Sequence, residues 1–105
     1  MVPLQVHADR THAYHLYVVR LDLARLRVNR AKAFSHLRER GIGANVHYAP
    51  VYLHSFYRAR GYEPGLCPVA EAGYEQILTL PMFPAMTRND VERVVGVLAE
   101  LAELS

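Results

Sequence analysis

The chain has 105 residues, of which 12 are lysine or arginine and 10 are aspartate or glutamate, giving a formal net charge of +2. This length suffices for one domain with its own core, and 51% hydrophobic with 21% charged residues is typical of a globular protein rather than a disordered one. The small charge argues against nucleic acid or an anionic membrane as partner, and a single cysteine without an apolar run of membrane-spanning length predicts a cytoplasmic protein.

The first part of the chain predicts an arm followed by a strand. Residues 1–12 show no clear period and are expected to form an N-terminal arm. Residues 13–21 are rich in aromatic and β-branched side chains, which favours a strand. Both faces of this strand are largely apolar, whereas a sheet covered on one side normally alternates apolar and polar residues. We therefore expect material to cover the second face too.

A helix over about 30–40 and a strand over 44–48 are predicted next. Asn29 is a good N-cap, the apolar residues that follow have helical spacing, and Gly41 suits the left-handed position that ends such a helix. Pro50 cannot donate a ladder hydrogen bond, so the strand ends there or lies at an edge.

The second half predicts a short helix over 53–60 stopped by Gly61, a helix with Pro68 in its first turn, and a third strand over 78–80. Thr87 and Asp90 form a capping box for the last helix. The predicted buried stripe of that helix is Val91, Val94, Val95, Leu98 and Leu101.

The sequence predicts neither a metal site nor a nucleophilic catalytic residue. His12 and His15 lie three apart near a strand and should point to opposite faces. His47, His54 and Cys67 match no zinc-ligand spacing. Cys67 is better read as a buried or capping residue than as a nucleophile, and the seven basic residues between 20 and 40 as a solvated helix face. The only lysine, Lys32, lies among these arginines, so we expect no complete Schiff-base mechanism within the chain.

The stretch over 41–54 holds the strongest candidate site. It places His47 and Tyr48 at the end of a predicted strand, beside Pro50, where a ligand has access. Adjacent strand residues point to opposite faces, so we expect one of the two to support the fold and the other to reach a ligand.

Four collinear segments together resemble one family. They are His-Leu-Tyr-Val-Val-Arg-Leu-Asp at 15–22, Gly-Ile-Gly-Ala-Asn-Val-His-Tyr-Ala-Pro at 41–50, Cys-Pro-Val-Ala-Glu at 67–71 and Leu-Pro-Met-Phe-Pro-Ala-Met-Thr at 80–87. In order and spacing they are similar to the C-terminal small domain of DegT-type sugar-nucleotide aminotransferases. The most similar branch aminates a UDP-linked 4-keto-6-deoxy-N-acetyl sugar for pseudaminic acid, and it includes enzymes of spore coat polysaccharide synthesis.

The resemblance implies an α+β fold for 13–105, with a small, mainly antiparallel three-stranded sheet packed with helices. Complete enzymes of this kind use pyridoxal phosphate and form homodimers. Their cofactor lysine and cofactor ligands lie in an N-terminal large domain, which is absent here. The isolated chain is therefore expected to be inactive, to bind no cofactor by itself, and to associate through the surface that the large domain would cover.

By the same resemblance, the small domain supplies the segment that faces the nucleotide sugar. The implied substrate-binding residues are Asn45, His47, Tyr48 and Pro50, with His54 and Tyr57 as second choices. Their role would be hydrogen bonding and shape recognition; the chain has no implied catalytic, cofactor-binding or metal-binding residue. Relatives commonly carry a larger apolar residue in place of Ala49 and a histidine in place of Tyr52, which leaves the preferred sugar open.

Two alternative functions remain open. A related dehydratase on the same fold is not separable from an aminotransferase here, because the distinguishing residue would replace the absent lysine. An independent binding module, for example for RNA, is opposed by the modest charge and the absence of an RNA-binding aromatic consensus, and salt-dependent RNA binding would test it.

Overall fold

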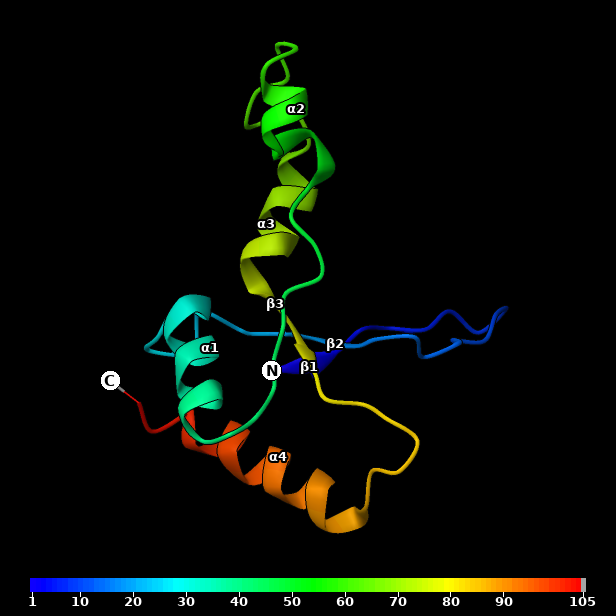
Figure 1. Ribbon diagram of the computed structural model, residues 1–105, viewed down its shortest axis with the longest axis vertical. Coiled ribbons are helices and arrows are strands. Elements are labelled where there is room, and N and C mark those ends of the chain that lie inside the picture. Colours follow the sequence, from blue (N-terminus) through cyan, green and yellow to red (C-terminus); the bar gives the residue numbers. More distant parts are fainter. Residues whose placement is uncertain (105) are drawn as a thin grey trace.

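The structure, a computed structural model, describes residues 1–104 and contains a three-stranded antiparallel sheet (Figure 1). Its strands are β1 (Val2–Pro3), β2 (Tyr17–Arg20) and β3 (Ile77–Leu80), in the order β1-β2-β3. The described chain also contains the helices α1 (Arg30–Glu39), α2 (Ser55–Arg58), α3 (Pro68–Gln76) and α4 (Arg88–Glu100), and a 3-10 helix, η1 (Val51–Leu53). The predicted α+β class with three mainly antiparallel strands is confirmed.

One predicted strand is absent, and one strand was not predicted. Residues 44–48 form no strand, and Asn45 alone makes an isolated bridge to Thr79. The third strand is instead β1, which lies within the stretch predicted as an arm and pairs Val2 with Arg20 and Pro3 with Val19. Strand pairing depends on a partner far away in sequence, so local β propensity did not identify it.

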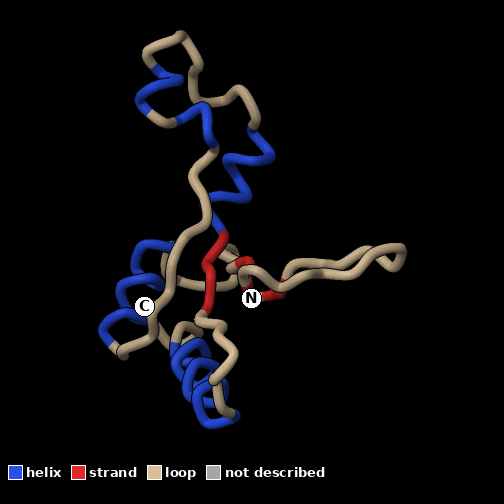
Figure 2. The backbone as a smooth tube through the Cα atoms, turned by 45° about the vertical axis from the view of Figure 1, so that its right-hand side comes forward, coloured by secondary structure: helices blue, strands red, loops and turns tan. Residues whose placement is uncertain are grey.

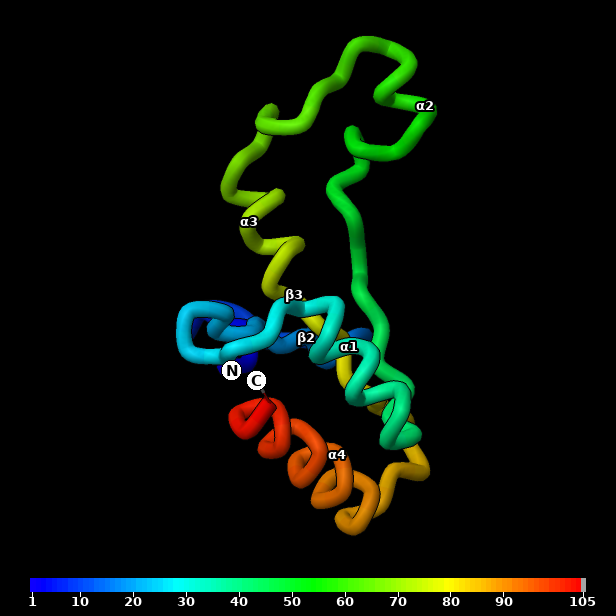
Figure 3. Tube along the Cα trace, turned by 90° about the vertical axis from the view of Figure 1, so that its left-hand side faces the viewer, coloured from blue at the N-terminus to red at the C-terminus, as the bar shows by residue number. Residues whose placement is uncertain are grey.

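The core is formed where β2 and β3 meet α1 and α4 (Figures 1 and 3). Val19 and Leu78 lie directly opposite each other in the β2–β3 register, and both are buried. From the helices, the core receives the fully buried Ala33 and Leu37 of α1, and Val94, Val97 and Leu98 of α4. Burying these side chains supplies most of the hydrophobic stabilisation of this part of the chain.

Both ends of α1 are closed as the sequence predicted. The Asn29 side chain accepts a hydrogen bond from the backbone N–H of Lys32 at 2.9 Å. At the other end, Gly41 has φ of +75°, and the N–H groups of residues 41 and 42 donate to the carbonyls of Arg38 and Leu37. This pair of hydrogen bonds is a Schellman motif, which favours glycine at the left-handed position.

The capping box of α4 is also confirmed, whereas its buried stripe was predicted only in part. Thr87 and Asp90 exchange the two reciprocal hydrogen bonds. Val94, Leu98 and Leu101 are buried, but Val91 and Val95 are 48% and 57% exposed. With the loop after β3, these two valines line an apolar hollow of about 330 Å³, whose other walls are Tyr17, Leu80, Pro81, Met82, Met86, Val94 and Leu98.

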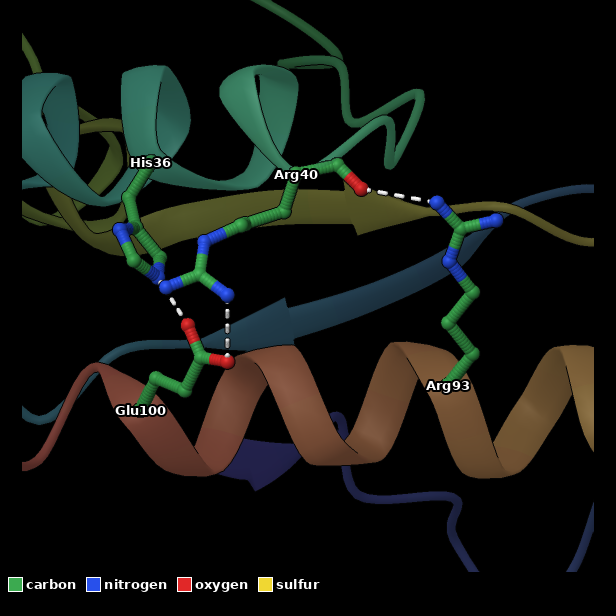
Figure 4. Close-up of polar contacts among 4 residues, drawn as sticks. All are labelled: His36, Arg40, Arg93 and Glu100. Carbon is green, nitrogen blue, oxygen red and sulfur yellow. Dashed lines mark hydrogen bonds and ion pairs between the residues drawn. The ribbon is translucent and has the colours of Figure 1, made fainter.

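Polar contacts fasten α1 to α4 at the edge of the core (Figure 4). The Glu100 carboxylate lies 2.8 Å from His36 Nε2 and accepts a hydrogen bond from Arg40 at 3.0 Å. Seven residues earlier on α4, the Arg93 guanidinium donates to the carbonyl of Arg40, again at 3.0 Å. The C-terminal end of α1 is therefore held at two points along α4.

The segment from η1 to α3 projects from this core as a separate lobe (Figures 1 and 2). Short helices at 51–53 and 55–58 replace the single helix predicted over 53–60, and Gly61 follows them with φ of +91°. The radius of gyration is 15.5 Å, compared with about 13 Å for a compact domain of this size. The chain is thus more extended than a typical compact domain of the same length. No helix within residues 1–104 has the length and hydrophobicity needed to cross a membrane.

Candidate functional site

The candidate site is built on the segment that leaves the core for the lobe. Its first fixed point is Asn45, whose backbone N–H donates to the Thr79 carbonyl at 3.0 Å and whose carbonyl accepts from the Thr79 N–H at 2.8 Å. This bridge adds the segment to the free edge of β3 at one residue. The Asn45 side chain is left exposed.

His47 is the second fixed point. Its Nδ1 lies 2.9 Å from the Thr79 hydroxyl, and the ring is half-buried. Thr79 is 5% exposed and is the one buried polar residue of the described core. Thr79 therefore holds the segment by both its backbone and its side chain. The sequence analysis did not select Thr79, because a threonine in a strand is an ordinary β-former and carries no local sign of this contact.

Tyr48 lies beside His47 rather than on the opposite side of a strand. The two ring centroids are 4.6 Å apart in an edge-to-face arrangement, and the peptide bond between the residues is cis. Tyr48 is 68% exposed. The prediction that the two side chains would point to opposite faces was wrong because residues 44–48 are not a strand. One residue is anchored and the other accessible, but they form a single cluster.

The other predicted site residues lie further along the chain. Pro50 is half-buried and precedes η1, while His54 is exposed between η1 and α2. Tyr57 packs edge-on against Phe56 and Tyr62, with ring centroids 5.1 and 5.8 Å away. Within residues 1–104, neither His54 nor Tyr57 forms a hydrogen bond or ring contact with His47 or Tyr48. The structure thus groups Asn45, His47 and Tyr48 and places the two second choices in the lobe.

The lobe has its own fastening, centred on Tyr52. The buried Tyr52 hydroxyl donates to the Glu71 carboxylate and accepts a hydrogen bond from the Cys67 N–H at 3.1 Å. Glu71 also accepts from the Gly65 N–H at 2.6 Å. Burial, followed by the hydrogen bond to Glu71, raises the pKa of Tyr52. Tyr52 therefore ties η1 to the start of α3.

The chemical groups of the candidate site are limited to a few polar and aromatic side chains. In the described residues, no carboxylate contacts His47, and no group of three or more histidine, cysteine, aspartate or glutamate residues is placed to hold a metal ion. The lysine content of the chain does not fit a Schiff base with pyridoxal phosphate either. Its only lysine, Lys32, is on the exposed side of α1, whereas a Schiff-base lysine needs a pocket shielded from water. What the site offers is a histidine nitrogen, an amide and an exposed aromatic ring.

Comparison with known proteins identifies relatives over almost the whole chain. The pattern of the DegT/DnrJ/EryC1/StrS aminotransferase family matches residues 1–99. The chain is 35% identical over 100 residues to the spore coat polysaccharide biosynthesis protein SpsC of Bacillus subtilis; this covers 93% of the chain and 26% of SpsC. The chain spans about a quarter of the length of the curated relatives it matches.

Solved structures give the same picture. DesV of S. venezuelae, in complex with a ketimine intermediate, superposes with a TM-score of 0.83 at 32% identity, covering 99% of this chain and 27% of DesV. A putative sugar aminotransferase of Streptococcus pneumoniae, in its PMP form, gives a TM-score of 0.80 at 28% identity and covers 97% of this chain and 26% of its own. In both structures, about three quarters of the protein lies outside the matched part.

Proposed function

The chain belongs to the DegT/DnrJ/EryC1/StrS aminotransferase family, and from this membership we propose that it is the substrate-side small domain of a pyridoxal-phosphate-dependent enzyme. The enzyme would transfer an amino group to a nucleotide-linked 4-keto-6-deoxy sugar used for surface polysaccharide or nonulosonic acid synthesis. The relatedness to a spore coat polysaccharide protein and to a sugar aminotransferase supports this substrate class. Pyridoxal phosphate and its lysine would come from the part of such an enzyme outside this chain.

The observation that carries the proposal is the cluster of Asn45, His47 and Tyr48. Two of its members are exposed, and the third is anchored to a buried residue of the core. Sugars are recognised by hydrogen bonds to their hydroxyls and by apolar contact with their ring faces, and amide, imidazole and phenol side chains supply both. These residues would orient the substrate and would take no part in proton transfer.

We also propose that a large domain, and a second subunit, cover the apolar surfaces that this chain leaves open. The hollow beside α4 presents Val91, Val95 and Met82, all at least 40% exposed, and the radius of gyration of 15.5 Å supports the proposal that neighbours cover this surface. An exposed apolar patch favours association. The isolated chain should therefore form dimers or larger species. A strictly monomeric chain at high concentration in analytical ultracentrifugation would contradict this, and Val95→Asp should shift the wild-type distribution toward monomer.

Titration of the ¹⁵N-labelled chain with UDP-N-acetylglucosamine tests the function. We expect amide shifts centred on residues 45–50, with weaker changes for UDP alone. Inorganic pyrophosphate, a diphosphate that lacks both the sugar and the base, is the control and should not reproduce the pattern. The proposal fails if the nucleotide sugar produces no shifts at millimolar concentration, or if single-stranded RNA binds instead with a steep salt dependence.

A second measurement tests whether the chain binds pyridoxal phosphate without the rest of the enzyme. Mixing the chain with pyridoxal phosphate should give no specific Schiff-base absorbance, because Lys32 is exposed on α1. Lys32→Arg is the matched control and should behave like the wild type. A stable absorbance band that Lys32→Arg abolishes would show that the chain holds the cofactor by itself, contrary to the proposal.

A further inference from the structure

We propose that Thr79 is a positioning residue that holds His47 in the tautomer with its ring proton on Nε2, so that the site presents a hydrogen-bond donor to an acceptor oxygen of its ligand. The tautomer follows from the geometry of the chain alone. The identity of the ligand, a nucleotide-linked sugar, rests on the proposed function.

The first step concerns the proton of the Thr79 hydroxyl. Thr79 is 5% exposed, and within residues 1–104 its hydroxyl forms one hydrogen bond, to His47 Nδ1 at 2.9 Å. If the hydroxyl only accepted in this contact, its own proton would have no protein acceptor in a buried place. Leaving a buried donor unpaired costs about 1–3 kcal/mol. We therefore assign the hydroxyl as the donor and Nδ1 as the acceptor. A neutral imidazole that accepts at one nitrogen carries its proton on the other, here Nε2.

The second step concerns how firmly Thr79 itself is held. Its N–H and carbonyl form the two backbone hydrogen bonds to Asn45, and its neighbour Leu78 is fully buried in the core. Successive strand side chains point to opposite faces. The Leu78 side chain therefore points into the core, and the Thr79 side chain points to the face on which His47 lies. The hydroxyl is placed by the sheet rather than by a mobile loop.

The third step concerns what the site offers a ligand. In the described chain, Nε2 of His47 has no hydrogen-bond partner, and the 68% exposed ring of Tyr48 lies edge-on beside it. A fixed N–H donor next to an exposed aromatic ring matches a sugar, which has acceptor oxygens around apolar ring faces, and a phosphoryl oxygen would also accept from Nε2. A ligand group that could only donate would not be matched.

Nitrogen NMR of the wild-type chain tests the tautomer directly. Spectra that correlate ring nitrogens with ring protons, recorded at alkaline pH where imidazoles are neutral, separate protonated from unprotonated nitrogens. His47→Gln identifies the His47 signals, and the exposed His7 and His54 serve as internal references for a freely exchanging ring. We expect His47 at the limit for the Nε2–H form. Signals at the opposite limit, or averaged like those of the references, would overturn the proposal.

Variants at Thr79 then test the cause. Thr79→Ser keeps the hydroxyl and should keep the limiting His47 signals. Thr79→Val keeps the shape and strand preference but not the hydroxyl, and should move the His47 signals to the averaged position of the references. Amide spectra establish whether each variant is folded. A folded Thr79→Val that retains the limiting signals would overturn the role of Thr79. If Thr79→Val does not fold, the wild-type and Thr79→Ser spectra still decide the tautomer.

Binding of UDP-N-acetylglucosamine tests the ligand step. Complete loss of one neutral hydrogen bond to the ligand would raise the dissociation constant about fivefold. Because an exchanging ring still carries its proton on Nε2 part of the time, we expect a loss of up to this size for Thr79→Val. For Thr79→Ser we expect no loss. Equal affinities for wild type and Thr79→Val would overturn the donor role. If the wild-type chain shows the Nε2–H form but does not bind the probe, the proposed function fails while the tautomer assignment stands.

Discussion

Replacing Glu100 with glutamine should weaken the α1–α4 contact measurably, because its one carboxylate contacts both His36 and Arg40 (Figure 4). The His36 side chain is 13% exposed and lies 2.8 Å from Glu100, whereas that of Arg40 is 53% exposed at 3.0 Å. A largely solvated ion pair contributes only about 0.3 kcal/mol. A partly buried, charge-assisted hydrogen bond contributes about 1 kcal/mol or slightly more. We therefore expect Glu100→Gln to lower the free energy of unfolding by about 1 kcal/mol, most of it through His36.

Urea unfolding followed by circular dichroism would measure this loss, together with a decrease in Tm of about 5 °C. The matched control is Glu92→Gln on the same helix, because Glu92 forms an exposed pair with Arg88 at 3.9 Å. This control should change stability by less than about 0.3 kcal/mol. In 1 M NaCl, screening should remove the Arg40 share and leave most of the Glu100 effect. Equal effects of the two substitutions would refute the argument that burial decides the value of these contacts.

The remaining predictions concern caps and the lobe. Thr87→Ala should lower the free energy of unfolding, measured with urea at pH 7, by about 1 kcal/mol. Hydrogen bonds from Thr87 lower the pKa of Asp90, so the stability that Asp90 contributes is present above its unfolded pKa and is lost as pH falls through its folded pKa. The difference between variant and wild type should therefore shrink at acid pH. Gly41→Ala should cost about 1–2 kcal/mol, since φ is +75° and the new methyl group would lie 3.0 Å from the Arg93 guanidinium. Tyr52→Phe should speed hydrogen exchange in the lobe alone, and exchange unchanged by the variant would contradict the role of the Tyr52 hydroxyl. Because the pKa of Tyr52 is raised in the folded chain, the wild-type lobe should also lose stability as pH rises above about 10.

The features predicted correctly from the sequence are those that depend on neighbouring residues. Asn29, Gly41 and the Thr87–Asp90 box act within a few residues of themselves, so their residue types were sufficient to place the ends of α1 and α4. A register that joins residue 2 to residue 20 has no local signal, and β1 was missed for this reason.

The site illustrates the same limit. The residue types at 45, 47 and 48 indicated a binding segment, but their geometry depends on Thr79, which lies 32 residues beyond His47. The apolar run at 44–48 predicted a strand because it has strand-like residues, yet only one of them pairs with β3. Likewise, α4 has a wide apolar stripe, and helical spacing alone did not predict which part of it α1 and the sheet would cover. Val91 and Val95 of this stripe stay exposed.

The polar networks around Thr79 and around Tyr52 indicate where a bound ligand would meet rigid and less rigid protein. Asn45 and His47 are held by Thr79, a residue of the sheet, whereas Tyr52 is held by Glu71, a residue of the lobe itself. Between these two fixed parts the chain carries the exposed Tyr48. Local stability follows the density of buried contacts. The histidine should therefore keep its position relative to the core even if the lobe changes orientation when a large domain or a second subunit covers it. A ligand that contacts both parts would depend on that partner for the lobe and on this chain alone for His47.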